Sequence, residues 1–172
     1  ESFADKGYHE TSMNEVAAAC GVSKPALYHY VRDKHELLVL ICEEHIARLR
    51  ELVRVVAQQA EADALDARTH LHRLILAFVE AYADAQHEHR VLTEDERHLG
   101  AAERDRVLAG QREVVAAFAR LVAAQRPDTL ADDLAKPLTM LLFGMINWMF
   151  TWLQPQGRLD HAAMAPMVVD LF

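Results

Sequence analysis

The sequence has few of the residues that interrupt helices, with only six glycines and five prolines among 172 residues. Long segments can therefore remain helical without a break. Runs of β-branched residues are scarce, while Ala, Leu, Glu and Arg dominate, which favours helix over strand. Hydrophobic residues make up 52% of the chain, enough to bury a core. We expect an all-α fold of one or two small helical domains.

Cysteine is also scarce. Cys20 and Cys42 have neither a CxxC partner nor metal-ligand spacing. We expect both thiols to be reduced and buried, as is typical of a cytoplasmic protein. No signal peptide is recognised, and the longest apolar run, residues 138–153, is too short to span a bilayer and contains polar residues. We therefore expect a cytoplasmic location and no membrane partner.

Sequence motifs of catalysis are missing as well. The chain has no nucleophile motif, no phosphate-binding glycine loop and no HExxH. It has three serines, and two of them, Ser12 and Ser23, stand at expected helix starts. We therefore assign no catalytic residue and no cofactor, and expect that the protein is not an enzyme.

The net charge of −8 argues against diffuse binding of nucleic acid over the whole surface. One segment differs, because residues 22–32 contain two cationic residues and no acidic one. Over residues 1–45, however, eight acidic residues oppose four lysines and arginines. This acidic balance leaves open a helical interaction module that has lost DNA binding.

Two short helices joined by a turn are expected near the start of the chain. Ser12, with Glu15 three residues later, forms a capping box for a helix over residues 13–19. Gly21 supplies a permissive backbone for the turn, and Ser23 caps a second helix of about seven residues. Asp33 and Glu36 form another capping box that starts the next helix. This pattern is a helix-turn-helix, whose second helix is suited to the major groove.

The same segment resembles the DNA-binding domain of TetR-type transcriptional regulators. The matched positions are Gly7, Tyr8, Thr11, Ser12, Met13, Val16, Ala17, Gly21, Val22, Ser23, Leu27, Tyr28, His29, Tyr30, Lys34, Leu37 and Leu38. The resemblance implies a domain over residues 1–45 that lacks the start of its first helix. It also implies a homodimer that binds a palindromic double-stranded operator, most often as a repressor.

Several residues of this segment are expected to contact DNA. Lys24 and His29 suit base edges or phosphates, and Tyr28 suits a phosphate. Lys34 resembles the phosphate-contacting lysine of the family, at a helix start that favours anions. Tyr30 aligns with an aromatic core position. The DNA-binding set is Thr11, Ser12, Ser23, Lys24, Pro25, Ala26, Tyr28, His29 and Lys34.

The remaining chain, residues 46–172, is expected to be a helical bundle for effector binding and dimerisation. Apolar spacing predicts helices over residues 33–60, 66–86, 101–125, 129–153 and 160–172, with stops at 126–128 and 154–157. Pro137 is expected to kink the fourth of these. Residues 87–100 are polar, and we expect a broken segment in which Thr93 and Glu96 cap a short helix ending at Gly100.

Residues 140–153 are apolar on all sides, so most of their surface must be covered. The family resemblance implies that residues 129–172 carry the dimer interface. A ligand pocket is expected at Phe78, Tyr82, Arg97, His98, Phe118, Phe143, Asn147 and Trp148. The aromatic residues among them also suit an ordinary core. Asn147 needs either a local backbone partner or a ligand, since an unsatisfied buried amide costs about 1–3 kcal/mol.

A further resemblance concerns the effector. Residues 91–92, 96–99, 143–148, 152, 155 and 157–159 are similar to the TetR-type branch that senses acyl-CoA thioesters. This implies a small-molecule effector with an apolar chain, and cations such as Arg97, Arg104 or Arg112 for its phosphates.

The ten histidines suggest a metal-responsive regulator of the same fold as the alternative. The pairs His70 and His72, and His87 and His89, have i, i+2 spacing, which places them on different helix faces. Only His87, Glu94 and His98 would be left to converge, so we expect no metal site.

Overall fold

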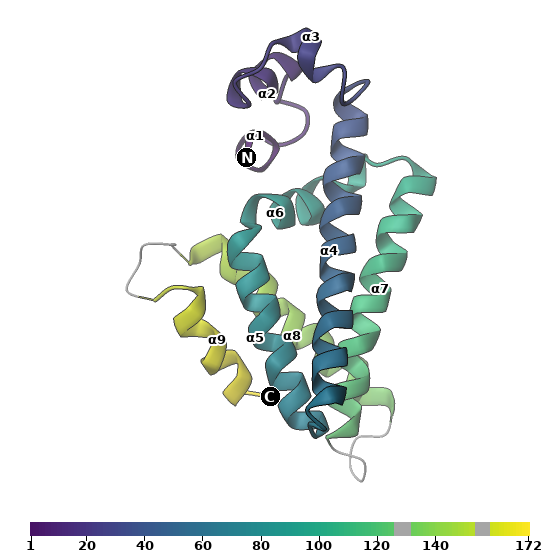
Figure 1. Cartoon of the computed structure of the whole chain (residues 1–172), viewed down its shortest axis with the longest axis vertical. Coiled ribbons are helices and arrows are strands. Elements are labelled where there is room, and N and C mark those ends of the chain that lie inside the picture. The colour runs from purple at the N-terminus through teal and green to yellow at the C-terminus, as the bar shows by residue number, and fades with distance from the viewer. Residues whose placement is uncertain (126–131, 154–158) are drawn as a thin grey trace. The chain divides into compact units, whose positions relative to one another are not determined.

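The computed structural model describes residues 1–125, 132–153 and 159–172, and over these ranges it is helical without strands, as expected (Figure 1). The expected stop at 126–128, the expected helix start at 129 and the turn at 154–157 lie outside the described residues. The helices are α1 Ser2–Lys6, α2 Met13–Ala19, α3 Lys24–Leu27, α4 Lys34–Ala62, α5 Ala67–Asp84, α6 Gln86–Asp95, the short 3-10 helix η1 Glu96–His98, α7 Ala101–Ala124, α8 Asp132–Trp152 and α9 His161–Asp170.

The chain forms two compact units. The first unit comprises residues 1–47 and 85–109, and the second comprises residues 48–84 and 110–172. The first unit thus combines the helix-turn-helix with a segment that follows α5 in the sequence. Helices α4 and α7 each run from one unit into the other.

Local capping defines α1, α2 and the start of α3 as predicted, although α3 has four residues instead of the seven expected. Gly7 ends α1 with φ 81°, and its N–H donates to the Phe3 carbonyl at 2.8 Å. The capping box of α2 is complete, because the Ser12 N–H donates to Glu15 Oε2 at 2.8 Å and the Glu15 N–H donates to Ser12 Oγ at 3.3 Å. Ser23 Oγ likewise accepts from the Ala26 N–H at 3.3 Å.

Three other local expectations were wrong. Glu36 does not complete a capping box with Asp33: its N–H donates to Asp33 Oδ1, but its carboxylate accepts from the backbone N–H and guanidinium of Arg32. Tyr30 is 82% exposed instead of packed, because Val31 lies at i+4 from Leu27 and takes the core position. Cys20 is exposed, whereas Cys42 is buried, and this burial raises its thiol pKa to about 12.

Residues 87–100 are more ordered than their composition suggested. Residues 86–95 form the regular helix α6, and the Thr93 hydroxyl donates to the His89 carbonyl one turn earlier instead of capping a new helix. Val91 and Leu92 pack with Phe3, Leu38 and other residues in one apolar cluster. Tertiary burial of this narrow apolar face therefore outweighs the polar composition of the segment.

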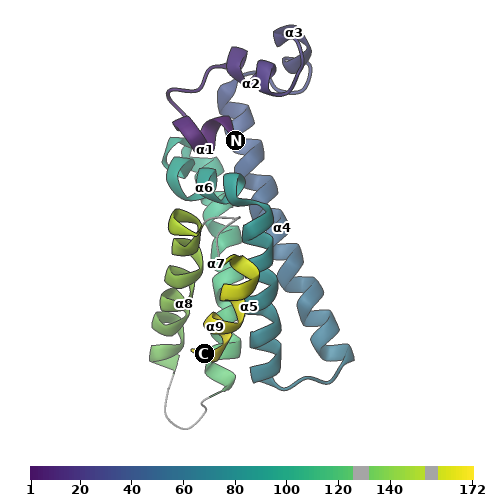
Figure 2. The same cartoon turned by 90° about the vertical axis from the view of Figure 1, so that its left-hand side faces the viewer.

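The second unit is built around α5. Its predicted face is buried as a whole, and α9 packs against both α5 and α8 (Figures 1 and 2). Asp160 caps α9 by accepting from the Ala163 N–H at 2.8 Å. Within α8, the buried Thr139 hydroxyl donates to the Ala135 carbonyl at 2.7 Å. The buried face of α5 consists of Leu71, Leu74, Ile75, Phe78, Val79 and Tyr82.

The α2 capping box makes the stability of the protein dependent on pH. The Lys6 ammonium, followed by the Ser12 N–H, lowers the pKa of Glu15 from 4.5 to about 2. This stabilisation is fully present above the usual carboxyl pKa and is lost as the pH falls through about 2. Glu15→Gln should therefore lower the thermal midpoint by a few degrees at pH 7, and the difference should shrink towards pH 2.

Circular dichroism melting curves at several pH values would measure this difference. Glu10→Gln is the matched control, since Glu10 is exposed and makes no ion pair with any described residue. Equal effects of the two substitutions at every pH would contradict the assignment.

Candidate nucleic-acid interface and effector region

The helix-turn-helix has its own small core. Met13 and Ala17 of α2 pack against Leu27 and Val31, and each of these side chains is at most 8% exposed. Leu27 and Val31 lie one helical turn apart in the sequence, so this packing fixes which side of α3 faces α2. The opposite side of α3 is thereby left to solvent.

That solvent-facing side and the turn after α3 carry most of the residues predicted to contact DNA. Ser23, Lys24, Pro25, Tyr28 and His29 are exposed, and Ala26 is half-buried. Lys24 Nζ lies 5.9 Å from the centroid of the Tyr28 ring. The structure thus presents a cationic and an aromatic side chain together, in a segment with no acidic residue between 22 and 32.

Thr11 and Ser12 lie at the start of α2 and differ in exposure. Thr11 is only 1% exposed, and its hydroxyl is within 2.9 Å of the carbonyl oxygens of Ser2 and Gly7. It holds α1 to the start of α2 and does not present its side chain to solvent. Ser12 is exposed, and its hydroxyl can accept a further hydrogen bond besides the one it makes with Glu15.

Lys34 links the start of α4 to the segment after α1. Its Nζ donates to the carbonyls of Tyr8 at 2.8 Å and His9 at 3.2 Å, and lies 4.5 Å from the Tyr8 ring centroid. Burial and the neighbouring Asp33 raise the pKa of Tyr8. An ammonium has three donors, so one donor of Lys34 remains for a phosphate.

Sequence reasoning missed two exposed side chains at the end of the helix-turn-helix. Tyr30 and Arg32 are both largely exposed, and Arg32 pairs with Glu36 at 3.1 Å. The signal that could have identified Tyr30 is the i, i+4 pair formed by Leu27 and Val31, which leaves Tyr30 on the outer side.

Four of the expected pocket residues meet in the core of the second unit. The Phe78 ring lies 4.8 Å from that of Phe118, and the Phe118 ring lies 4.9 Å from that of Phe143, both edge to face. Tyr82 packs 5.8 Å from Phe78, and burial raises its pKa. These rings form a tight aromatic cluster. Nearby in sequence, the buried Asn147 Oδ1 accepts no hydrogen bond from any described residue.

The other expected pocket residues lie elsewhere. Arg97 and His98 belong to the first unit, where His98 packs against His9 and Tyr8 at ring distances of 4.3 and 5.2 Å. Burial lowers the pKa of His98, and the nearby His9 and Arg97 lower it further. Trp148 is 66% exposed and faces a groove between α8 and α9.

This α8–α9 groove has a volume of about 480 Å³ and an almost entirely apolar lining. Leu141 and Leu171 on its rim are 64% and 70% exposed. The lining residues are Met140, Leu141, Gly144, Met145, Trp148, Met149, Trp152, Met164, Met167, Val168 and Leu171.

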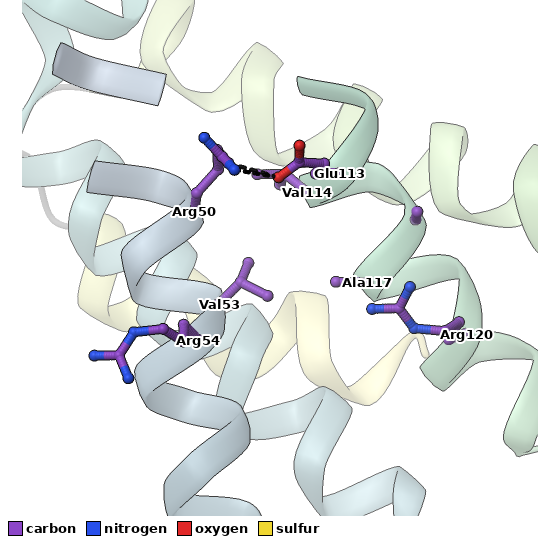
Figure 3. A pocket seen from close by; sticks show the side chains of 8 residues that line it. Arg50, Val53, Arg54, Glu113, Val114, Ala117 and Arg120 are labelled. Carbon is purple, nitrogen blue, oxygen red and sulfur yellow. Dashed lines mark hydrogen bonds and ion pairs between the residues drawn. The ribbon is translucent and has the colours of Figure 1, made fainter. Parts of the chain in front are cut away.

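A second groove, of about 320 Å³, separates α4 and α7 within the second unit (Figure 3). Its α4 wall consists of Arg50, Val53 and Arg54. Its α7 wall consists of Glu113, Val114, Ala116, Ala117 and Arg120. Arg50 and Glu113 face each other across the gap at 2.6 Å.

In the part of the chain that the structure describes, no three His, Cys, Asp or Glu residues are grouped so that they could hold a metal ion. In the same part of the chain, no helix combines the length and apolarity needed to cross a membrane.

Family models match both parts of the chain. Residues 1–41 match the bacterial regulatory proteins of the tetR family, and residues 64–172 match the tetracyclin repressor-like C-terminal domain. The transcriptional activator FasR of Mycolicibacterium smegmatis is 33% identical over 96 residues, which are 56% of this chain and 42% of FasR. The repressor KstR2 of Rhodococcus jostii is 32% identical over 107 residues, 59% of this chain and 48% of KstR2. The chain thus spans less than half the length of these two curated relatives.

Solved structures agree with this assignment. A TetR-family regulator from Bordetella parapertussis has a TM-score of 0.89 and 34% identity, covering 98% of this chain and 86% of that chain. AibR, solved with isovaleryl coenzyme A and operator DNA, has the same fold, with a TM-score of 0.82 and 24% identity over 99% of this chain and 91% of AibR. The proteins in these families are transcriptional regulators and not enzymes. The chain belongs to the TetR family of bacterial transcriptional regulators.

Proposed function

We propose that this TetR-family regulator is a repressor that binds a palindromic operator as a homodimer and releases it when a small hydrophobic effector binds. The observation that carries the proposal is the exposed surface formed by α3 and the turn after it, where Lys24, Tyr28 and His29 are solvent-exposed in a segment with no acidic residue between 22 and 32. A short helix of this kind, fixed on its own core, can enter the major groove.

The proposed contacts divide by chemistry. Lys24 of α3 and His29 of the following turn reach base edges or phosphates, while Tyr28, Ser12 and Ser23 offer hydroxyls to phosphates. Pro25 and Ala26 allow close approach because their side chains are small. Lys34 uses its third donor for a phosphate beside the start of α4. Thr11 makes no DNA contact in this proposal, because its buried hydroxyl binds the carbonyls of Ser2 and Gly7.

A second copy of the chain is the proposed occupant of the α8–α9 groove. Contiguous exposed apolar surface of this kind is unusual on a monomer. Large apolar side chains on both helices, among them Leu141, Trp148 and Leu171, would be covered by the same surface of a partner in a two-fold interface. Such a dimer also supplies the two recognition helices that a palindromic operator requires.

An acyl-CoA thioester is the proposed effector class. AibR has been solved with isovaleryl coenzyme A, which supports this class for a chain of the same fold. In the second unit, the aromatic cluster of Phe78, Phe118 and Phe143 would open to admit the acyl chain. The buried Asn147 Oδ1, which lacks a donor among the described residues, would accept a hydrogen bond from the effector.

Effector binding would reach the DNA-binding helices through α4. For this, the effector needs a higher affinity for the conformation that cannot fit the operator than for the conformation that can. Helix α4 continues from the second unit into the helix-turn-helix unit. A displacement of its second-unit part would therefore alter the residues at its start, which follow α3 in the chain.

Operator binding is the first prediction of this proposal. Fluorescence anisotropy with DNA from upstream of the protein's own gene should show a preference over random DNA and a steep decrease in affinity with salt. Lys24→Ala should weaken operator binding about tenfold, as expected for loss of one base or phosphate contact. Arg68→Ala, which removes an exposed cation from α5, should have little effect. Equal affinities for operator and random DNA at every salt concentration would refute the proposal.

Dimerisation is tested separately. Leu141→Glu places a charge in the proposed interface and should convert the dimer to a monomer in analytical ultracentrifugation at micromolar concentration. Leu40→Glu is the matched control, because Leu40 is also exposed but lies on α4 outside the groove. A wild-type monomer, or a Leu141→Glu dimer of unchanged affinity, would contradict the interface.

The effector prediction uses the operator assay with a series of acyl-CoA thioesters and free coenzyme A. At least one thioester should release the operator where free coenzyme A does not. Asn147→Leu keeps a similar volume and should raise the thioester concentration needed for release about tenfold, with operator affinity unchanged. Release by none of the thioesters at saturating concentration would remove acyl-CoA as the effector class.

A further inference from the structure

The groove between α4 and α7 combines a hollow with positive charge. Three of its lining side chains are cationic, Arg50, Arg54 and Arg120, and one is anionic, Glu113. Its volume of about 320 Å³ lies at the lower end of the range for small-molecule sites, about 300–1,000 Å³. The groove therefore suits a compact anion better than a long chain.

The guanidinium groups are not equivalent. In Figure 3, Arg120 extends from α7 towards the gap, and no described residue pairs with it. Arg50 faces the gap from α4 but is bound to Glu113, while Arg54 turns away, towards Glu51 at 2.7 Å on its own helix. Arg120 is thus the cation most available to a ligand.

The two existing ion pairs are readily exchanged. The side chains of Arg50 and Glu113 are 51% and 58% exposed, and those of Arg54 and Glu51 are 54% and 57% exposed. Exposed pairs of this kind contribute little to stability, because water and salt screen them. A phosphate, by contrast, can accept paired hydrogen bonds from each planar guanidinium, and such charge-assisted bonds are stronger.

The floor of the groove is apolar. Val53 on one side and Val114 and Ala117 on the other present methyl groups between the cations. Inorganic phosphate would leave this surface uncovered. A ligand with a flat or apolar part beside its phosphate would cover the floor and bind the arginines at once.

We propose that this groove is a binding site for an organic phosphate of nucleotide size. Its phosphate group lies between Arg50 and Arg120, Arg54 turns from Glu51 to bind it as well, and its ring system covers Val53, Val114 and Ala117. Glu113 is the competing anion that the ligand displaces from Arg50. The bound phosphate bridges α4 and α7 in place of the Arg50–Glu113 pair.

Calorimetric titration of the wild-type protein with ADP, pyrophosphate and adenosine tests this proposal, without any need for operator binding. ADP should bind with a dissociation constant that increases with salt, and more tightly than either pyrophosphate or adenosine. Arg120→Ala should weaken ADP binding about tenfold. Glu113→Gln should tighten it several-fold, because the competing carboxylate is removed.

Arg68→Ala is the control, since Arg68 is an exposed cation of α5 that does not line the groove. Opposite effects of Arg120→Ala and Glu113→Gln on ADP affinity indicate a ligand site. If the two residues had only a structural role, both substitutions would lower the stability of the protein and neither would tighten ADP binding. Absence of ADP binding at millimolar concentration, equal losses in Arg120→Ala and Arg68→Ala, or equal affinities for pyrophosphate and ADP would overturn the proposal. The operator assay is independent of each of these outcomes.

Discussion

The continuity of α4 is the constraint on which the rest of the structure depends. The helix runs for 29 residues from Lys34 to Ala62 without a glycine or proline, a length of ~44 Å at 1.5 Å per residue. Its first part belongs to the helix-turn-helix unit and its remainder to the second unit. Every residue in it shares one hydrogen-bonded register, so it offers no ready point for a kink.

Contacts within the first unit hold the start of this helix. Lys34 binds the carbonyls of Tyr8 and His9, and Asp33 accepts from the Glu36 N–H. Further along, His45 of α4 lies 3.3 Å from His89 of α6, and both side chains are buried. Arg106 of α7 pairs with Glu43 at 2.7 Å. The helix that follows the recognition segment is thus attached on several sides by polar contacts, which are specific in geometry.

The second unit has an aromatic core and two surface grooves of different polarity. Its core is a cluster of aromatic rings, but α8 and α9 leave large apolar side chains exposed between them. The α4–α7 groove, in contrast, has a cationic rim. These two grooves of the second unit differ in chemistry, which fits the proposed dimer interface for one and the proposed small-molecule site for the other.

Most of the fold was predictable because its signals are local. Caps at Ser12, Ser23 and Asp160, and the apolar spacing of α5, depend only on neighbouring residues. The errors have tertiary causes. Tyr30 is exposed because Val31 takes the core position, and α6 is regular because Val91 and Leu92 pack against α1 and α4.

In the candidate site, too, the local features could be predicted from the sequence and the tertiary features could not. The exposed side of α3 could be predicted from sequence, since a short helix with one apolar face must expose the other. The arrangement of the expected pocket could not. Arg97 and His98 belong to a different unit from Phe78 and Phe118, and the groove of Arg50 and Arg120 joins residues far apart in the sequence.

The most direct test of the account is whether the effector changes the spacing of the two recognition helices. Spin labels at Tyr30→Cys, in a Cys20→Ser background, would report this distance by pulsed electron resonance, because Tyr30 is exposed while Cys42 is buried. With operator bound, we expect one narrow distance distribution, set by half-sites about one helical turn apart. Adding an effector that releases the operator should shift or broaden it. An unchanged distribution in the released protein would contradict the proposed coupling through α4.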